Sequence, residues 1–298
     1  MKILILSRNT NYYSTQRLVE EAKKKHYQTL VIDQLQCNIS INEQPPHFSV
    51  SANKRNLSKF DVVIPRIGII GIDYALLVLQ QFESMGIPML NSTASLSYTK
   101  NKFQALQILY KAGIPVPDTV MTHNSQEVPL IIKKLGGLPI ILKLFRGSQG
   151  KGVILGENIS SIQSILTAVW AIGYDILLQK YLNDTKGQDI RILVLGNNII
   201  ATMKRIPAKN EFRSNIHQGG LMKKVTVSSE EAQLAIKSAK VLGLNLSGVD
   251  IMRTKKGPLV IEVNASPGFE GLEKLTRINI ARKIIDYAVD LPRLKRNN

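Results

Sequence analysis

The chain has 298 residues, 44% hydrophobic and 20% charged, a composition typical of a globular protein with two or three subdomains and not of a disordered chain. Its one cysteine, Cys37, excludes a disulfide framework and a thiolate metal cluster, which indicates a reducing cytoplasm. The formal net charge of +17 indicates polyanionic partners such as nucleic acid, a ribosome, acidic peptides or phosphates, although solvated helix faces explain it about equally well.

The first third of the chain alternates short apolar runs with helical patterns. The patterns are strand-like at residues 2–7, 29–33, 60–68 and 87–91 and helical at 14–25 and 74–82. This alternation predicts a small Rossmann-like α/β domain with a doubly wound parallel sheet over residues 1–95. No G-x-G-x-x-G follows the first strand, so a dinucleotide site is not expected.

The apolar segments are too short for a membrane protein. The longest, residues 67–79, contains Asp73 and falls short of the length that crosses a bilayer. The N-terminus has too few apolar residues for a signal-peptide core. We therefore expect neither membrane insertion nor export.

The rest of the chain predicts two further subdomains of α+β character. A helix from Thr99 to Ala112 and two strands that flank a Gly-rich loop would form a central subdomain over residues 96–177. The last subdomain, residues 178–298, would contain a hairpin over 189–206, a helix with a Ser228–Glu231 capping box, a second hairpin over 247–264 and a closing helix over 275–289.

Two polar residues interrupt the last apolar strand, LVIEVN. Glu262 and Asn264 share one face of it because side chains alternate along a strand, and Asp250 of the same hairpin can lie beside them. Two carboxylates and a carboxamide are hard ligands that suit Mg²⁺ or Mn²⁺, which combine few protein ligands with substrate phosphates and water. A strand whose acidic side chains simply face solvent explains the pattern about equally well.

A lysine and a Gly-rich loop form a candidate phosphate site. Lys143 lies between Leu142 and Leu144, where its ammonium needs an anion or access to water. The loop that follows, residues 147–152, can bring backbone N–H groups close to phosphate oxygens as a flap. It lacks the Walker A spacing, and a flexible surface hairpin is the alternative interpretation.

A third set of polar residues lies in the segments DIR and FRSNIHQGG. Asp189 and Arg191 share a strand face, and the second segment concentrates hydrogen-bond donors in a loop. Arg213 could neutralise charge on a transferring phosphoryl group or an acyl phosphate. His217 has no second His or Cys at ligand spacing, so we expect it near the substrate at most.

The order of these motifs resembles the ATP-grasp superfamily. It runs from Lys102 near a helix start through Lys143, the Gly-rich flap, LQKYL, DIR and FRSNIHQGG to Asp250, Glu262 and Asn264. Within that superfamily, FRSNIHQGG, GVDIM and GPLVIEVNASPGFEGLEK closely resemble the RimK-type ribosomal-protein glutamate ligases, and the resemblance covers nearly the whole chain. It implies an ATP-grasp fold preceded by the small Rossmann-like domain.

The resemblance implies a role at each matching position. The catalytic residues would be Arg213 and Lys143. ATP would bind Lys102, Lys143, Gln179, Lys180, Tyr181, Leu182, Asp189, Arg213, Ser214 and Asn215, beneath a flap of Gly147, Ser148, Gln149, Gly150 and Gly152. Two Mg²⁺ or Mn²⁺ ions would bind Asp250, Glu262 and Asn264, and the substrates would contact Arg66, Arg191, His217, Gly219 and Ser266.

The resemblance also implies an activity and its partners. An ATP-dependent carboxylate–amine ligase would convert a C-terminal carboxylate into an acyl phosphate and join it to the amine of L-glutamate, releasing ADP and phosphate. The acceptor would be the C-terminal tail of a small-subunit ribosomal protein, reached in the cytoplasm and in contact with the ribosome, and the enzyme would be a homotetramer. Lys180, Arg146 and Lys204 stand where relatives commonly carry acidic residues, which leaves the side-chain contact to adenine and the substrate open.

Two other functions fit the same residues. An ATP-grasp ligase that makes a small glutamyl or other amino-acid conjugate would have the same ATP motifs, so only its acceptor would differ. A non-catalytic basic RNA- or ribosome-binding protein is the alternative outside enzymes. Against it, aromatic residues make up only 6% of the chain and form no stripe interleaved with basic residues.

Overall fold

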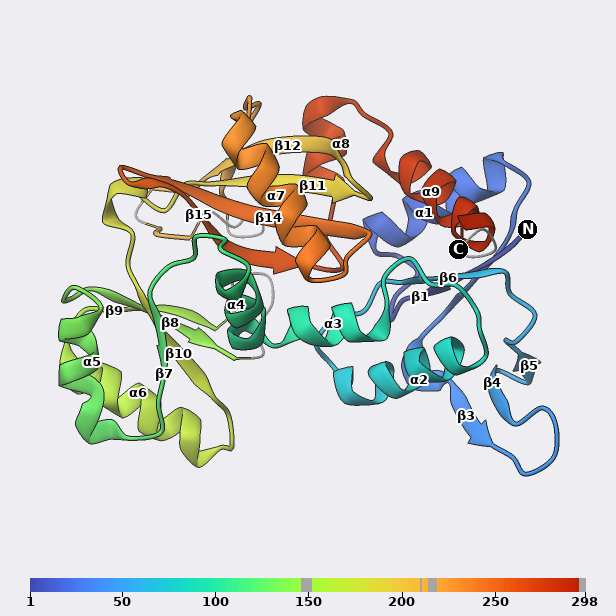
Figure 1. Ribbon diagram of the computed structural model, residues 1–298, viewed down its shortest axis with the longest axis horizontal. Helices are drawn as coiled ribbons and strands as arrows, with labels where there is room; N and C mark the ends of the chain where they lie inside the picture. Colours follow the sequence, from blue (N-terminus) through green and yellow to red (C-terminus); the bar gives the residue numbers. More distant parts are fainter. Residues whose placement is uncertain (146–151, 210, 214–218, 295–298) are drawn as a thin grey trace.

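A parallel three-stranded sheet forms the centre of the N-terminal unit, as the alternating sequence predicts. The structure is a computed structural model, and it describes residues 1–145, 152–209, 211–213 and 219–294. The sheet order is β2 (Gln28–Ile32), β1 (Lys2–Leu6) and β6 (Val62–Pro65). Helix α1 (Tyr13–Lys24) connects β1 to β2, and α2 (Ile72–Ser84) follows β6 (Figure 1).

The fourth predicted strand is reduced to one parallel bridge between Val63 and Met89, so its predicted length is wrong. Pro88 has no N–H for a sheet ladder. After this bridge the side-chain amide of Asn91 donates to the carbonyl of Ala265, in the C-terminal part of the chain, at 2.9 Å.

A small antiparallel sheet extends from the N-terminal unit and was not predicted. It consists of β3 (Asn38–Ile41), β4 (Phe48–Ala52) and β5 (Arg55–Asn56). These strands are short and rich in polar residues, and only Val50 and Ala52 among their residues are buried. The apolar alternation that marks a strand is therefore weak here.

Two helices stand where one was predicted from Thr99: α3 (Thr93–Lys100) and α4 (Lys102–Lys111). The break lies at Asn101, whose backbone is extended and whose side-chain oxygen accepts the N–H of Gln104 at 2.8 Å. An asparagine that caps one helix at the end of another accounts for the difference.

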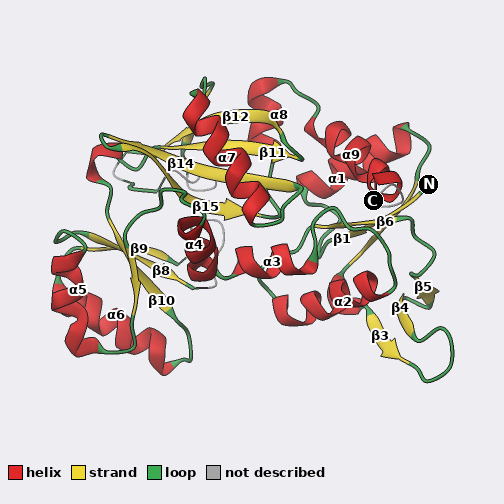
Figure 2. Cartoon of the chain, viewed as in Figure 1, coloured by secondary structure: helices red, strands yellow, loops and turns green. Residues whose placement is uncertain are grey.

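The central unit is an antiparallel sheet with helices on one face. Its order is β7 (Thr119–Met121), β10 (Ile176–Lys180), β8 (Ile140–Leu144) and β9 (Val153–Gly156). Helices α5 (Val128–Lys134) and α6 (Ile159–Ala171) cover it, away from the rest of the molecule (Figure 2). The predicted boundary at residue 177 lies inside β10.

The C-terminal unit is a five-stranded antiparallel sheet. Its order is β13 (Leu221–Lys223), β12 (Asn198–Ile206), β11 (Asp189–Leu195), β14 (Leu246–Thr254) and β15 (Gly257–Asn264). Helix α7 (Ser229–Val241) packs on this sheet. Its predicted capping box is confirmed: Glu231 N–H donates to Ser228 Oγ at 3.2 Å, and Ser228 N–H donates to the Glu231 carboxylate at 2.8 Å.

The closing helix is also divided in two, α8 (Glu270–Thr276) and α9 (Ile280–Leu294), where one was predicted. Arg277 ends α8 with a left-handed backbone (φ 62°). The side-chain oxygen of Asn279 then accepts the N–H of Arg282 at 3.0 Å and starts α9. None of the helices among the described residues is long and apolar enough to span a bilayer.

Among the described residues, the buried apolar side chains form three clusters. One joins side chains of β1, β6 and α2 to those of β11, β14, β15 and α7. A second joins α1 and β1 to β11, α8 and α9. The third contains only residues of the central unit. The N-terminal and C-terminal units therefore share their cores, whereas the central unit has its own.

Candidate active site

One cavity of about 980 Å³ is lined by residues of all three units. The lining includes side chains of the central sheet, the C-terminal sheet and the loops that follow β1, β6 and β15. It brings together most of the polar residues that the sequence singled out in separate motifs: Arg66, Lys102, Lys143, Gln179, Lys180, Tyr181, Leu182, Asp189, Arg191, Arg213, Asp250, Glu262, Asn264 and Ser266.

Residues 179–182 line part of the cavity where β10 leaves the central sheet. The Gln179 side chain is buried, and the Lys180 ammonium is 3.3 Å from the carboxylate of Asp118. Within the described residues, the backbone N–H groups of Tyr181 and Leu182 have no hydrogen-bond acceptor. Backbone donors are thus left for a ligand, while the Lys180 side chain already has a partner.

Lys143 is a half-buried cation on β8 that forms no ion pair with any described residue. Burial lowers the pKa of Lys143 to about 8, although Glu262 acts in the opposite direction. Lys102 begins α4, and its Nζ is 3.4 Å from the carbonyl of Leu144 at the end of the same strand. Two ammonium groups thus face one cavity, and a bound anion would balance their charge.

A β-bulge aligns the acidic residues. The register of β14 and β15 shifts by one residue at Asp250, which therefore stands opposite Glu262, while Gly248 stands opposite Asn264. If the strand pairing next to the turn between β14 and β15 continued without this shift, Asp250 would stand opposite Ile261. Its side chain would then point to the face of the sheet opposite to Glu262. The bulge brings both carboxylates and the amide to one face.

Asp250 is already held by two arginines. Arg191 donates to its two oxygens at 2.5 and 2.7 Å, and an Arg205 nitrogen lies 2.9 Å from Asp250 Oδ2. Burial raises the pKa of Asp250, but the two guanidinium groups outweigh burial and hold the pKa below its usual value. Gly248 leaves room for this arrangement, since a Cβ there would lie 2.9 Å from Pro267 and 3.2 Å from Arg191.

The donor set near β15 fits a magnesium ion. Glu262 forms no ion pair with a described residue, and the side-chain nitrogen of Asn264 is buried without a hydrogen-bond partner. In the described ranges, no three His, Cys, Asp or Glu side chains are placed to hold a metal. A cation here would therefore be bound by two carboxylates and an amide. Mg²⁺ typically has few protein ligands and completes its coordination with phosphate oxygens and water.

A second bulge sets the position of Asp189. The register of β11 and β12 shifts between Leu193 and Val194, which places Asp189 opposite Arg205. Arg205 Nε donates to Asp189 at 2.6 Å, so this arginine bridges Asp189 and Asp250. The two carboxylates outweigh burial and raise the pKa of Arg205.

Arg213 lies beside the strand that follows the Gly-rich loop. Its guanidinium donates to both oxygens of Glu211, at 3.0 and 2.8 Å, and to the carbonyl of Val153 in β9 at 3.4 Å. These bonds lower the pKa of Glu211 to about 2. The contact connects Arg213 to the central sheet.

The remaining predicted residues differ in their placement. Gly152 precedes β9 with φ +79°, and a Cβ there would lie 2.6 Å from Leu144, so the position requires glycine. Gly219 is exposed, and neither it nor Lys204 belongs to the cavity lining. The predicted residues outside the described ranges are Arg146, Gly147, Ser148, Gln149, Gly150, Ser214, Asn215 and His217.

Three residues of the site were missed. Arg205 and Glu211 hold predicted residues in ion pairs, and Lys100, the last residue of α3, lines the cavity and donates to the carbonyl of Ile67 at 2.8 Å. Burial, together with Arg66, lowers the pKa of Lys100 to about 8. In the sequence Thr-Lys-Asn-Lys, Lys100 lies two residues before Lys102, and this closeness is the sequence signal that could have indicated Lys100.

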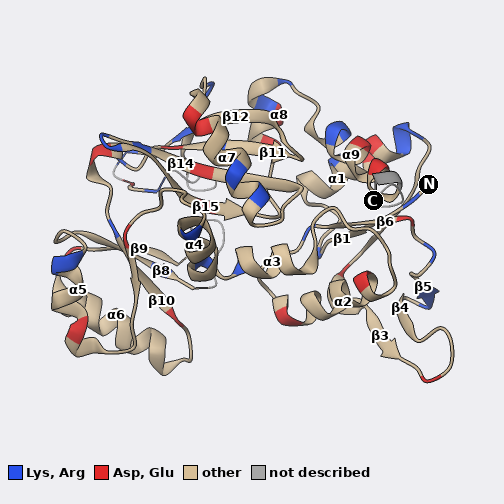
Figure 3. Cartoon of the chain, viewed as in Figure 1, with Lys and Arg blue, Asp and Glu red and all other residues tan. Residues whose placement is uncertain are grey.

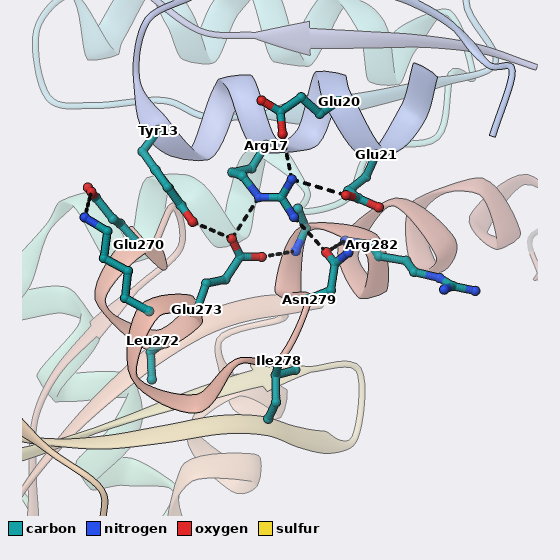
Figure 4. Close-up of polar contacts among 12 residues, drawn as sticks. Tyr13, Arg17, Glu20, Glu21, Glu270, Leu272, Glu273, Ile278, Asn279 and Arg282 are labelled. Carbon is teal, nitrogen blue, oxygen red and sulfur yellow. Dashed lines mark hydrogen bonds and ion pairs between the residues drawn. The ribbon is translucent and has the colours of Figure 1, made fainter. Parts of the chain in front are cut away.

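A polar network joins α1 to α8 (Figure 4). Glu273 accepts hydrogen bonds from Tyr13 Oη at 2.7 Å, Arg17 Nε at 3.0 Å and the N–H of Ala281 at 3.0 Å. The Tyr13 ring meets the Phe269 ring edge-on, with 6.2 Å between centroids. Tyr13 and Phe269, both lining residues, are therefore held by the interface between α1 and α8.

The sequence matches two family descriptions end to end. The RimK PreATP-grasp domain matches residues 1–96, and the RimK-like ATP-grasp domain matches residues 99–288. A probable alpha-L-glutamate ligase of Marinobacter nauticus is 42% identical over 287 residues, covering 96% of this chain and 95% of the relative. A protein of the same name from Coxiella burnetii is 41% identical over the same length.

Solved structures share the fold at low sequence identity. The ATP-grasp ligase PsnB, complexed with a minimal precursor, superposes with a TM-score of 0.75 at 21% identity, over 97% of this chain and 98% of PsnB. A D-alanine–D-alanine ligase from Bacillus anthracis, complexed with ATP, gives 0.73 at 20% identity, over 100% of this chain and 99% of that chain. The predicted fold, an ATP-grasp fold with an N-terminal parallel-sheet unit, is confirmed. The chain belongs to the RimK-like family of ATP-grasp ligases, enzymes that form amide bonds.

Proposed function

We propose that this protein is an ATP-dependent ligase that joins L-glutamate to a carboxylate, and that its acceptor is the C-terminal tail of a small-subunit ribosomal protein. One observation carries the ligase chemistry: the half-buried Lys143 ammonium, which forms no ion pair with a described residue, lies in one cavity with Asp250, Glu262 and Asn264. Glutamate is supported by the names of relatives that share 42% of their sequence with this chain.

ATP would bind between the central and C-terminal sheets. The free backbone N–H groups of Tyr181 and Leu182 suit the adenine ring, and Lys143 and Lys102 suit the phosphates. Asp189 would support the ribose side through its ion pair with Arg205. Because Lys180 is paired with Asp118, its side chain would contribute little to adenine binding.

Two Mg²⁺ or Mn²⁺ ions would be held by Asp250, Glu262 and Asn264, with the phosphates completing their coordination. When bound, such ions neutralise charge on the phosphates and orient the γ-phosphoryl group. Asp250 can contribute only if it shares its oxygens with Arg191 and Arg205, which already occupy them.

The reaction would proceed in two balanced steps. An acceptor carboxylate oxygen attacks the γ-phosphorus, which forms an acyl phosphate and breaks the bond to ADP. The neutral amine of glutamate then attacks the acyl carbon, which forms the amide, expels phosphate and releases a proton. Lys143 and Arg213 would offset the negative charge that develops on the phosphoryl group, and the enclosing units would exclude water from the acyl phosphate.

The ribosomal acceptor rests on the resemblance of the motifs and on charge. The net charge of +17 suits an acidic tail and contact with the ribosome. Basic residues are dispersed over all three units rather than gathered on one element (Figure 3), which favours charge steering over a dedicated RNA groove.

The same resemblance implies a homotetramer, and the ribosomal acceptor implies a cytoplasmic enzyme. Light scattering on the purified protein measures the tetramer.

An acceptor assay tests the proposal. Purified protein is incubated with ATP, Mg²⁺, L-glutamate and the small-subunit ribosomal protein, and the acceptor is weighed by mass spectrometry. We expect mass increments of one or more glutamate residues together with ADP release. Glu262→Gln should abolish both while leaving the melting temperature near that of the wild type.

The exposed Glu157→Gln is the matched control and should behave as the wild type. An unmodified ribosomal protein, with small amino-acid conjugates in the supernatant, would favour a small-molecule ligase instead. Full activity of Glu262→Gln would remove the assigned site.

A further inference from the structure

The end of the cavity formed by the N-terminal unit contains a guanidinium without a counter-ion. Arg66 follows β6 and lines the cavity. Its Nη2 donates to the carbonyl of Pro267 at 2.7 Å and to Ser14 Oγ at 3.2 Å. Its Nε and Nη1 are buried and have no hydrogen-bond partner among the described residues. No described carboxylate forms an ion pair with it, so a buried charge remains uncompensated.

Other donors without acceptors lie close to this arginine. The carbonyl of Ser266 is 3.5 Å from Arg66 Nη2, and the Ser266 hydroxyl is buried without a hydrogen-bond partner. The side-chain nitrogen of Asn264, two residues earlier, is also buried without a partner. Lys100 adds a second, half-buried cation to the same cavity, because its ammonium donates to the carbonyl of Ile67, the residue next to Arg66, at 2.8 Å. Buried donors in a native structure are nearly always paired, so this group of donors is suited to an acceptor-rich anion.

The anions already present do not balance these cations. Asp250 is neutralised by Arg191 and Arg205. Glu262 is the carboxylate that interacts with both Lys100 and Lys143. ATP phosphates at Lys143 and Lys102 would balance the other end of the cavity but leave the end at Arg66 positive.

The position of Arg66 is fixed before any ligand binds. Its guanidinium lies over the Phe269 ring, 5.9 Å from the centroid, and Phe269 packs against Tyr13. Tyr13 is in turn held by Glu273 (Figure 4). A guanidinium fixed in this way can bind a planar carboxylate through two parallel hydrogen bonds.

We propose that Arg66 binds a substrate carboxylate that does not react, at a subsite completed by Lys100, Asn264 and Ser266. The inference rests on the proposed ligase function and names the carboxylate subsite of that site. The carboxylate has two sources, the incoming L-glutamate, through its α- or its side-chain carboxylate, or an acidic side chain of the acceptor tail. Because Nε and Nη1 are covered in this structure, binding also requires neighbouring side chains to shift.

Steady-state kinetics of Arg66→Met and Arg66→Lys test this subsite. We expect the KM for one of the two carboxylate-bearing substrates to rise roughly 10- to 100-fold, as the loss of charge-assisted hydrogen bonds implies. The KM for ATP should stay within about twofold. Arg66→Lys keeps the charge but not the fork, so its effect should be intermediate. The control is Arg55→Met, an exposed arginine of β5 outside the cavity lining, and it should change neither KM.

The substrate that responds identifies the source. If the KM for L-glutamate rises, wild-type discrimination between L-glutamate and either its α-amide or L-glutamine should fall in Arg66→Met, and the amide that responds identifies the carboxylate. If the KM for an acceptor peptide rises, discrimination between acidic and amidated peptide tails should fall. Unchanged KM values for both, or a matching rise for ATP, would overturn the proposal.

Folding and function are separated by two further measurements. Methylguanidinium should partly restore the KM of Arg66→Gly, which a purely structural defect would not allow. Calorimetric binding of L-glutamate and of the acceptor peptide to the protein with Mg²⁺ and a non-hydrolysable ATP analogue needs no turnover. If the wild type makes no glutamate conjugate, the proposed function is wrong. If wild type and Arg66→Met bind both ligands equally well, the proposed carboxylate subsite is wrong.

Discussion

The half-buried Lys143 side chain faces the cavity from β8, and no described carboxylate is close enough to form an ion pair with its ammonium. In the folded protein its pKa is lowered to about 8 from an ordinary value of 10.5. Burying a charge in this way lowers the stability of the fold in the absence of an anion. The residue is therefore better explained by what it binds than by what it packs against.

Replacing Lys143 with methionine should stabilise the protein and abolish ADP formation. Removing the buried charge should raise the free energy of unfolding by about 1–3 kcal/mol at pH 7. The wild-type penalty is complete below pH 8 and absent above pH 10.5, so the advantage of Lys143→Met should shrink as pH rises between these values. Urea unfolding at several pH values measures this difference.

The exposed Lys133→Met is the control and should change the unfolding free energy by less than about 0.5 kcal/mol. A Lys143→Met protein less stable than the wild type at pH 7 would contradict the prediction.

Residues of the site could be predicted where their chemistry conflicts with their strand. Lys143 and Glu262 interrupt apolar runs, so their side chains need a partner that the strand does not supply. Arg205 could not be found in this way. Counting back from the turn between β11 and β12 places Lys204 opposite Asp189, and only the bulge at Val194 moves Arg205 into that position.

At the scale of elements, helix ends account for two of the differences from the predicted fold. Long apolar periodicity predicted single helices over 99–112 and 275–289, but Asn101 and Asn279 each start a new helix by capping it. The side chain that caps a helix competes with continuation of the helix, and periodicity alone does not decide between them. The strands β8, β9, β11 and β15 were predicted because apolar runs and turns agree there.

The interface between α1 and α8 depends on Glu273. Burial raises the pKa of this carboxyl group, but its hydrogen bonds from Ala281, Tyr13 and Arg17 outweigh burial and hold the pKa below its usual 4.5. Glu273→Gln should lower the free energy of unfolding by about 1–3 kcal/mol at pH 7. The wild-type stabilisation is present above pH 4.5 and lost as pH falls, so the difference should narrow at pH 4. Denaturant titrations at both pH values measure it.

Glu270→Gln, in the same helix, is the matched control. Its carboxylate forms an exposed i,i+4 pair with Lys274, so its loss should change stability by less than about 0.5 kcal/mol. Equal effects of the two substitutions would show that the network in Figure 4 does not stabilise the interface as proposed.

At the scale of the whole molecule, the apolar cores group the three units differently from their order along the chain. Two apolar clusters run through both the N-terminal and the C-terminal units, while the central unit encloses a separate cluster. We therefore propose two mechanical parts, the central sheet with α5 and α6, and everything else. The cavity lies between them, lined by Lys143 on one side and Glu262 on the other.

Nucleotide binding should draw these two parts together. A non-hydrolysable ATP analogue with Mg²⁺ would contact Lys143 and Glu262 at once, so the radius of gyration measured by small-angle X-ray scattering should decrease. Lys143→Met, which loses one of the two contacts, should contract less at the same analogue concentration. An unchanged wild-type radius at saturating analogue would rule out closure of the central unit.

The shared cores also limit how this protein can be recombined with its relatives. Leu4 and Leu6 of β1 pack in the same cluster as Ile192 and Val249 of the C-terminal sheet. A chimaera that takes its first 95 residues from another ligase would therefore have to match an interior surface as well as a recognition surface. Changes of substrate preference are then easier to obtain through single side chains at the cavity than through exchange of whole segments.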